Sequence, residues 1–152
     1  MSNEIKDKAK EYLKAELSVM PTKEGKIPAV TTWDPFQEKA LTDLEIDKLF
    51  KGEKIRPEIE REKTKQDGTK YIAKGIKTYS KIKGLAIITG AISGNLEVID
   101  VDTKHDDKGT LWDELSTLFK DNEPELYKSL VIAKTMSGGY HIYYRCSSIA
   151  GN

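Results

Sequence analysis

The fold is constrained most by a series of short apolar runs, separated by turn residues, between residues 84 and 145. One run spans residues 85–89 and another spans residues 96–102, with the turn Ser93-Gly94-Asn95 between them. Short apolar runs bounded by turn residues are typical of buried strands. Because so few residues connect these two runs, we expect them to form a hairpin.

Three further elements are expected in the same part of the chain. Residues 109–120 have apolar side chains at helical spacing, and residues 130–135 and 140–145 are predicted to be two more core strands. The side chains expected to face inward from the helix are Leu111, Trp112, Leu115, Leu118 and Phe119. Helices set apart from a mainly antiparallel sheet predict an α+β domain.

The first half of the chain has weaker patterns. Residues 3–17 are predicted to form an amphipathic helix, and residues 20–32 an extended loop because they contain two prolines and a glycine. Thr42 and Glu45 match a capping box, which would begin a short helix that ends near Gly52. The inward side chains of that helix would be Ile46, Leu49 and Phe50.

Size and composition predict a globular chain. We treat residues 1–152 as a single domain, with residues 1–24 as a helical lead-in. Hydrophobic residues make up 38% and charged residues 33%, which argues against disorder. The chain has no apolar run long enough to span a bilayer and no signal-peptide pattern, so we expect a cytoplasmic protein with no membrane partner. The single cysteine, Cys146, excludes an internal disulfide framework.

Charge is unevenly distributed although the net charge is zero. Residues 51–83 contain eleven Lys/Arg against five Asp/Glu, and residues 97–125 contain three against ten. Two solvated faces would explain this, as would a basic surface for a polyanion and an acidic pocket for cations. Within the basic segment, residues 53–83 are a lysine-rich insertion with a turn signal at Asp67-Gly68. Both a hairpin, with residues 70–74 as one strand, and a mobile loop are compatible with this pattern.

The first candidate functional motif is Asp100-Val101-Asp102, at the end of an apolar strand. Side chains alternate across a strand, so Asp100 and Asp102 point to the same face. Two neighbouring carboxylates repel each other and favour a cation, and hard oxygen ligands suit Mg²⁺ or Mn²⁺. The alternative is a strand that ends at the surface with both acids solvated.

The second motif runs from Thr135 to His141 and contains Ser137-Gly138-Gly139. Paired glycines let backbone N–H groups approach an anion closely, and Ser137 can add a hydroxyl donor. His141 shares a strand face with Tyr143 and Arg145. Taken alone, the motif is equally compatible with an ordinary hairpin turn and a half-buried histidine. Together, the two motifs supply what phosphoryl transfer needs, namely metal ligands and fixed donors.

The two motifs, in this order and spacing, resemble the Prim-Pol domain of the archaeo-eukaryotic primase superfamily, the N-terminal module of bifunctional DNA primase/polymerases. That family pairs an hhDhD/E strand, where h is apolar, with an s-x-H strand. The Gly25-Lys26-Ile27-Pro28 segment with Trp33 also resembles the family, as does the hairpin-like stretch 84–94. The resemblance covers most of residues 25–145 and implies an RRM-like α+β core.

The resemblance also implies roles for individual residues. Asp100 and Asp102 would be ligands of a two-metal centre that uses Mg²⁺ or Mn²⁺. Ser137 and His141 would contact the phosphates of the incoming nucleotide, and Gly138-Gly139 would shape the turn. The catalytic residues would then be Asp100, Asp102 and His141.

Two basic residues have weaker assignments. Arg145 is a candidate nucleotide-binding residue only because it shares a strand face with His141. Lys26 would contact DNA or nucleotide phosphate, or would be an ordinary surface lysine.

The family completes its metal centre with a third carboxylate on a later strand. No residue after Tyr144 is acidic, so we expect this third ligand to be absent or to lie beyond Asn152. We therefore expect an N-terminal portion of a Prim-Pol domain that is weak or inactive by itself.

Three functions remain open at this point. The first is template-directed nucleotidyl transfer from nucleoside triphosphates in DNA replication, on single-stranded template DNA, with a helicase domain or protein as a possible partner. The second is a replication accessory domain that binds nucleotide or single-stranded DNA without catalysis. The third is another metal-dependent phosphotransfer enzyme or a nuclease. The candidate DNA-binding residues are Lys26, Lys63, Lys65, Lys70, Lys74 and Lys77.

Overall fold

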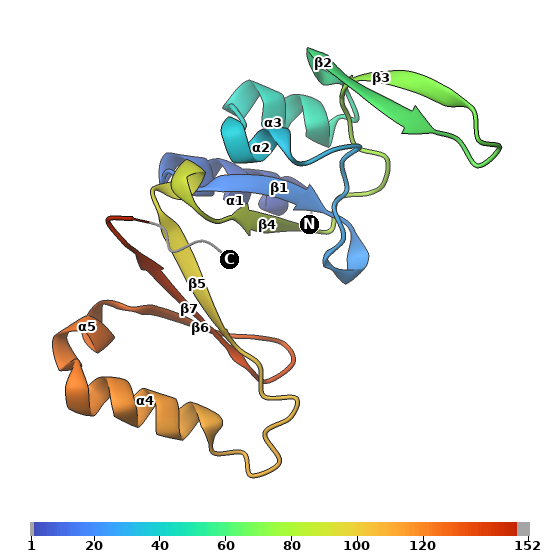
Figure 1. Cartoon of the computed structure of the whole chain (residues 1–152). Coiled ribbons are helices and arrows are strands. Elements are labelled where there is room, and N and C mark those ends of the chain that lie inside the picture. The colour runs from blue at the N-terminus through green and yellow to red at the C-terminus, as the bar shows by residue number, and fades with distance from the viewer. Residues whose placement is uncertain (1, 149–152) are drawn as a thin grey trace. The chain divides into compact units, whose positions relative to one another are not determined.

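The computed structural model of the chain describes residues 2–148, which fall into two compact units. The first unit ends at Ile88 and the second begins at Thr89. Both units contain antiparallel strands and α-helices, and the described residues form five α-helices (Figure 1). This confirms the predicted α+β class. Within residues 2–148, no helix is long and apolar enough to cross a bilayer.

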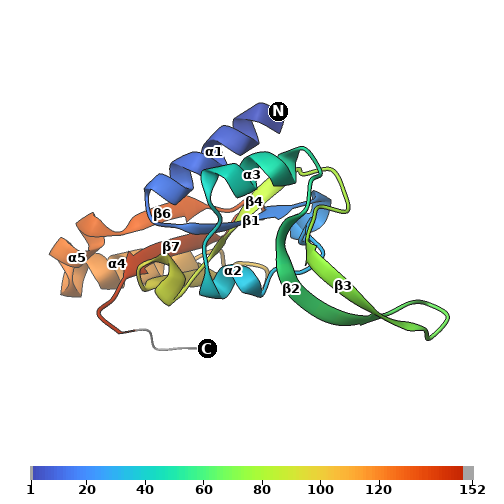
Figure 2. The ribbon, with the colours of Figure 1, turned by 90° about the horizontal axis from the view of Figure 1, so that it is seen from above.

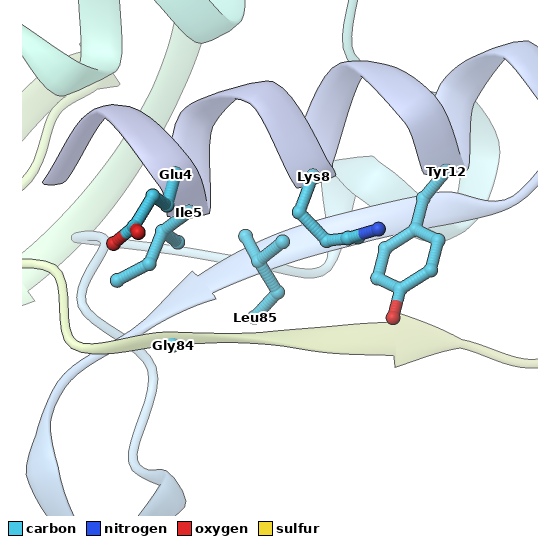
Figure 3. A pocket seen from close by; sticks show the side chains of 6 residues that line it. All are labelled: Glu4, Ile5, Lys8, Tyr12, Gly84 and Leu85. Carbon is cyan, nitrogen blue, oxygen red and sulfur yellow. The ribbon is translucent and has the colours of Figure 1, made fainter. Parts of the chain in front are cut away.

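In the first unit, helix α1 (Ser2–Lys14) lies against an antiparallel strand pair formed by β1 (Ser18–Thr22) and β4 (Gly84–Ile88). The side chains of Ile5 and Tyr12 point from α1 toward β4 (Figure 3). They line a pocket of about 300 Å³ whose surface is mostly apolar. The pocket is therefore a packing feature of the contact between α1 and β4 rather than a polar site.

Strand β1 corrects the prediction of an extended loop over residues 20–32. All five residues of β1 are buried, and they pair with β4, more than sixty residues later in the sequence. Only the short 3₁₀ helix Glu24–Lys26 and the segment after it keep a loop-like path. The predicted helix over residues 3–17 ends earlier, at Lys14, and Glu16 has a positive φ of 59°. Helical backbone does not continue through a left-handed residue.

Helices α2 (Pro35–Glu38) and α3 (Asp43–Phe50) complete the helical part of the first unit. The predicted capping box is present: Glu45 N donates to Thr42 Oγ1 at 3.2 Å, and Thr42 N donates to Glu45 Oε2 at 2.9 Å. The predicted inward residues are Ile46 and Leu49, which are buried, and Phe50, which is half-buried. Gly52 follows the helix with φ +77°.

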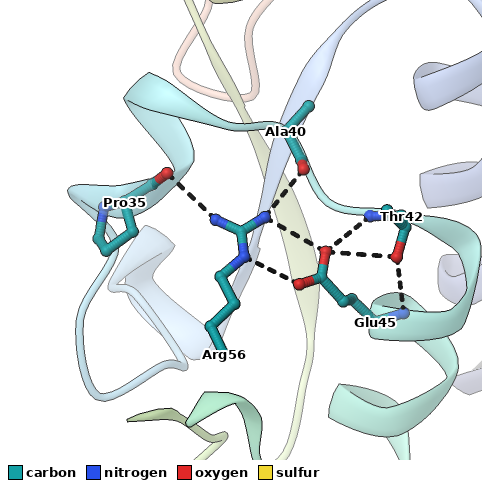
Figure 4. Close-up of polar contacts among 5 residues, drawn as sticks. All are labelled: Pro35, Ala40, Thr42, Glu45 and Arg56. Atoms are coloured by element: carbon teal, nitrogen blue, oxygen red, sulfur yellow. Dashed lines mark hydrogen bonds and ion pairs between the residues drawn. The ribbon is translucent and has the colours of Figure 1, made fainter. Parts of the chain in front are cut away.

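Arg56 anchors the next strand to these two helices (Figure 4). Its guanidinium is buried and donates to both carboxylate oxygens of Glu45, to the Pro35 carbonyl and to the Ala40 carbonyl. A buried charge is tolerated when it is paired and its remaining donors are satisfied. Burial raises the pKa of Glu45, but hydrogen bonds from Arg56 and Thr42 outweigh that effect and hold the pKa below its usual value.

The lysine-rich insertion forms a hairpin of β2 (Ile55–Thr64) and β3 (Lys70–Ile76) rather than a loop. Its turn is at the predicted Asp67-Gly68: Thr69 N donates to Asp67 Oδ1 at 2.9 Å, and Gly68 has φ +84°. A bulge interrupts the pairing between Ile55 and Glu60. The hairpin extends away from α1 and α3 (Figure 2).

The second unit contains an antiparallel sheet with strand order β5-β7-β6. Its strands are β5 (Leu96–Val101), β6 (Val131–Lys134) and β7 (Tyr140–Arg145), and a 3₁₀ helix (Ala91–Ser93) precedes β5. The predicted hairpin between residues 85–89 and 96–102 is wrong. The connection between the two runs holds a 3₁₀ helix rather than a tight turn, and strand β4 pairs with β1 and strand β5 with β7.

Helices α4 (Leu111–Asn122) and α5 (Pro124–Ser129) join β5 to β6. The ring of Trp112 stacks on that of Tyr140 with centroids 3.8 Å apart, so α4 covers the sheet face that carries Tyr140 and Ile142.

Two predictions about apolar residues in this unit are wrong. Leu111 and Leu118 are exposed, because α4 packs through the narrower stripe of Trp112, Leu115, Ser116 and Phe119. Strand β6 is an edge strand rather than a core strand, and its Val131 is 65% exposed.

Candidate functional site

Strands β5 and β7 bring Asp100 and His141 together. The two residues are direct cross-strand partners, so their side chains emerge on the same face of the sheet. His141 Nε2 lies 3.5 Å from Asp100 Oδ1. This face is the one opposite Trp112 and Tyr140, because side chains alternate along β7. Asp100 is 68% exposed, so its carboxylate is open to a ligand.

The other nitrogen of the His141 ring is held by Tyr143. The Tyr143 hydroxyl lies 3.1 Å from His141 Nδ1, and the two rings meet edge to face. A hydrogen bond at one ring nitrogen fixes the orientation of the ring and leaves the other nitrogen for a ligand. Tyr143 was not predicted as a site residue. Its position two residues after His141 on a strand was the available signal.

Asp102 lies one residue beyond the end of β5, where the backbone turns. Lys104 holds its carboxylate: Lys104 N donates to Oδ1 at 3.0 Å, and Lys104 Nζ lies 2.7 Å from Oδ2. These hydrogen bonds from Lys104 lower the pKa of Asp102. The side chain is still 46% exposed. Asp102 therefore keeps a charged, accessible carboxylate, and the Lys104 ammonium beside it would compete with a metal ion for Oδ2.

The predicted glycine turn, residues 135–139, packs against the end of β5. Gly139 makes this possible, because a Cβ at that position would lie 2.4 Å from the Val101 carbonyl oxygen. Gly138 has φ +95°, a conformation that glycine adopts without strain. The turn is closed by Thr135 N donating to Gly139 O at 2.8 Å. The hydroxyl of Ser137 lies 3.1 Å from that of Thr135.

Asp100, Asp102, His141 and the turn of residues 135–139 therefore form one cluster in the second unit. The turn that carries Ser137 contacts the same strand end that carries Asp100 and leads to Asp102. Within residues 2–148, no group of three or more His, Cys, Asp and Glu side chains has the arrangement of a metal site. The candidate metal ligands in this cluster are the carboxylates of Asp100 and Asp102.

Arg145 is not brought to this cluster. It pairs with Leu96 at the opposite end of β7, about 13 Å along the strand from His141. Its guanidinium packs over Gly94, where an added Cβ would lie 2.8 Å from one terminal nitrogen.

The six lysines predicted to bind DNA all belong to the first unit. Lys26 ends the 3₁₀ helix with a positive φ of 62° and is exposed. Lys63, Lys70 and Lys74 lie on the β2–β3 hairpin, Lys65 precedes its turn, and Lys77 directly follows β3.

Comparison with known proteins identifies one family. Residues 9–151 match Prim-Pol, the family described as bifunctional DNA primase/polymerase, N-terminal. This confirms the resemblance predicted from the Asp100-Val101-Asp102 and Ser137–His141 motifs. No curated protein and no solved structure matches the chain.

Proposed function

Since the chain belongs to the Prim-Pol family of bifunctional DNA primase/polymerases, we propose that it carries a site for template-directed nucleotidyl transfer. The 3′-hydroxyl of a growing strand would attack the α-phosphorus of a nucleoside triphosphate, and pyrophosphate would leave. The observation that carries this proposal is the cross-strand pair of Asp100 and His141. This pair is a carboxylate and an imidazole side by side next to a glycine turn, which supports the proposal.

Asp100 and Asp102 fit a divalent metal ion of the Mg²⁺ or Mn²⁺ type. Both offer accessible carboxylate oxygens, which are the ligands these hard cations prefer. When bound, the metal would neutralise the triphosphate and activate the attacking hydroxyl. Lys104 has to release Oδ2 of Asp102 for that oxygen to serve as a ligand. The ammonium is then free to neutralise phosphate charge.

The other residues of the cluster would hold the triphosphate. His141 can present Nε2 to a phosphate oxygen while Tyr143 fixes Nδ1. Backbone N–H groups of the turn and the Ser137 hydroxyl are further donors, and fixed donors stabilise charge that develops during phosphoryl transfer. Arg145 has no part in this proposal, because it lies at the other end of β7.

Asp100→Asn and His141→Gln variants test the proposal in two assays. One is primer synthesis on a single-stranded template, and the other is metal-dependent binding of a nucleoside triphosphate. We expect each variant to lose at least about 100-fold in synthesis, the scale of losing one charge-stabilising group. Asp107→Asn, which removes an exposed carboxylate outside the cluster, is the matched control. Unchanged synthesis and binding in both site variants would refute the assignment.

The same assays separate the two alternative functions. Nucleotide binding that depends on Asp100 and His141, without synthesis even when the chain is extended to include the third carboxylate, would indicate a non-catalytic accessory domain. Phosphodiester cleavage without nucleotide incorporation would indicate a nuclease. The cross-strand geometry favours neither alternative over nucleotidyl transfer.

A further inference from the structure

The charged side chains of the β2–β3 hairpin are sorted between its two faces. On one face, Lys74 Nζ lies 2.5 Å from Glu60 Oε1 and Lys70 Nζ lies 2.8 Å from Glu62 Oε1. The register places these four residues on the same side of the hairpin. Each ammonium on this face therefore has a carboxylate partner, and the face is electrically balanced.

The opposite face carries Lys63 and Tyr71, which are direct cross-strand partners. Lys63 Nζ donates to the Thr31 carbonyl at 2.7 Å, which is a neutral acceptor. An ammonium has three N–H donors, so at least two remain for another ligand. The positive charge of Lys63 is therefore held in place without being neutralised, whereas Arg61 on the same face is paired with Asp34 at 2.7 Å.

A groove of about 290 Å³ lies along this face of the first unit. Nine residues line it and none is a carboxylate; its four lysines are Lys54, Lys63 and Lys77, together with Lys74 from the ion-paired face. Its wall includes Lys54, whose stem packs directly over Gly75, where an added Cβ would lie 2.8 Å from Lys54 Cγ. Thr31 N donates to the Lys77 carbonyl at 2.9 Å, which joins the two sides of the groove.

Of the four lysines that line the groove, Lys74 is ion-paired with Glu60, whereas Lys54, Lys63 and Lys77 have no such partner among the described residues. Within the described part of the chain, neither Lys54 nor Lys77 has a carboxylate within ion-pair distance. Tyr71 is 43% exposed, so part of its ring is available for contact. A basic groove combined with an accessible aromatic ring suits a single nucleic acid strand, because lysines follow the phosphates and the ring stacks on a base.

We propose that this groove, bordered by Lys54, Lys63, Tyr71 and Lys77, binds single-stranded nucleic acid. The identity of the ligand as a template rests on the proposed function, whereas the groove itself belongs entirely to the first unit. The structure thereby divides the lysines predicted from sequence. Lys63 and Lys77 are assigned to binding, whereas Lys70 and Lys74 are neutralised by ion pairs, although Lys74 also borders the groove.

The first test compares two double variants with the same change in charge. Lys63→Gln/Lys77→Gln alters the groove, and Lys51→Gln/Lys70→Gln alters exposed lysines outside it. Binding of a labelled oligothymidylate of about 16 nucleotides is measured against salt concentration, with a chelator and without nucleotide. We expect only the groove variant to lose affinity, with the slope of log K against log salt reduced by about 1.4. Equal losses in both variants, or no loss in either, would overturn the proposal.

The second test uses the tyrosine and does not disturb the Lys63 hydrogen bond. Tyr71→Leu should weaken oligothymidylate binding roughly tenfold, the scale of losing one stacked base, whereas Tyr71→Phe should bind normally. An abasic oligonucleotide of the same length should not distinguish the two variants. If Tyr71→Leu and Tyr71→Phe bind the oligothymidylate equally, stacking in the groove is excluded. Equally tight binding of a polyglutamate peptide would identify a general polyanion surface instead.

Failure of this proposal can be told apart from failure of the proposed function. Asp100→Asn should lose synthesis and keep oligonucleotide affinity, because the assay contains no metal or nucleotide. Lys63→Gln/Lys77→Gln should keep metal-dependent nucleotide binding and lose oligonucleotide affinity. A groove variant that loses nucleotide binding as well would contradict the separation of the two sites.

Discussion

The Tyr143 hydroxyl lies 3.1 Å from Nδ1 of His141, on the side of the ring away from Asp100. This contact holds Nδ1 and orients Nε2 toward the Asp100 carboxylate, 3.5 Å away. A residue two positions along the strand thus sets the orientation of the residue proposed to meet the triphosphate.

Tyr143→Phe should weaken nucleotide binding while leaving the sheet intact. Loss of one hydrogen bond corresponds to about two- to tenfold in affinity. The change should also alter the ¹⁵N chemical shifts of the His141 ring, which report its tautomer, and a merely structural role would not do so. Tyr144→Phe is the matched control, because the Tyr144 hydroxyl donates to Glu97 on the other face. Equal effects of the two substitutions would argue against a positioning role.

Lys104→Ala should strengthen the binding of Mn²⁺ to the cluster. The Lys104 ammonium occupies Oδ2 of Asp102 and lowers the pKa of that carboxyl, so it competes with a cation for the same oxygen. We expect Mn²⁺ affinity to rise a few-fold in the variant, measured by electron paramagnetic resonance. Lys108→Ala removes an exposed lysine from the same loop and should have little effect. Weaker Mn²⁺ binding in Lys104→Ala would mean that Asp102 is not a ligand.

Nucleoside triphosphate should increase the affinity of the protein for Mn²⁺. Mg²⁺-type ions usually combine one or two carboxylates with phosphate oxygens, so Asp100 and Asp102 are expected to share the metal with the nucleotide. The check is a Mn²⁺ titration with and without a nonhydrolysable triphosphate. Asp102→Asn should abolish the increase, and an increase that survives this change would place the metal elsewhere.

Gly139→Ala should distort the turn against β5. Its Cβ would lie 2.4 Å from the Val101 carbonyl, and overpacking of this kind costs about 1–3 kcal/mol. Urea unfolding followed by Trp112 fluorescence should show the lower free energy of unfolding. A separate binding assay should show weaker nucleotide binding. At Gly138 an added Cβ meets nothing closer than Thr103 Oγ1 at 4.0 Å, so Gly138→Ala should carry only the cost of its positive φ. Equal costs at the two positions would contradict the close approach.

Glu45→Gln should make the free energy of unfolding of the first unit less dependent on pH in the acidic range. The folded pKa of Glu45 lies below its usual value, so its contribution is present above pH about 4.3 and is lost as pH falls through the folded pKa. At pH 7 the variant should lose about 2–3 kcal/mol in the free energy of unfolding. The difference from the unaltered protein should shrink below pH about 4. Glu38→Gln, an exposed carboxylate nearby, should change neither value.

Much of the candidate site could be predicted because it depends on local regularities. Paired glycines predict a tight turn before His141, and that turn is present. Alternation predicts Asp100 and Asp102 on one face, but Asp102 lies one residue beyond the end of β5, so this stays a prediction. Local sequence patterns do not show which strands pair with each other. The predicted loop over residues 20–32 includes the second half of β1, because the partner strand Gly84–Ile88 is far away in the sequence and supplies the pairing that makes β1 a strand.

The other differences between prediction and structure also arise from contacts between segments that are distant in the sequence. Leu118 fits the helical spacing but is 60% exposed, since periodicity does not reveal how wide a stripe the sheet will cover. Arg145 shares a face with His141, but it lies four positions farther along the extended strand. The roles of Lys70 and Lys74 depend on which glutamate lies across the hairpin, which only the register determines.

The Arg56 anchor has a consequence for motion in the hairpin. A two-stranded hairpin is marginally stable in water, so β2 and β3 depend on their attachment to the rest of the first unit. Arg56 is fixed at the base by Glu45, Pro35 and Ala40, and Lys63 donates to the Thr31 carbonyl farther out, whereas the hydrogen bond described for Asp67 at the tip lies within its own turn. Amide hydrogen exchange should therefore slow progressively from Thr69 toward Ile76, because the strands open from the tip inward. A groove along such a hairpin can widen at its outer end while its inner end keeps its shape.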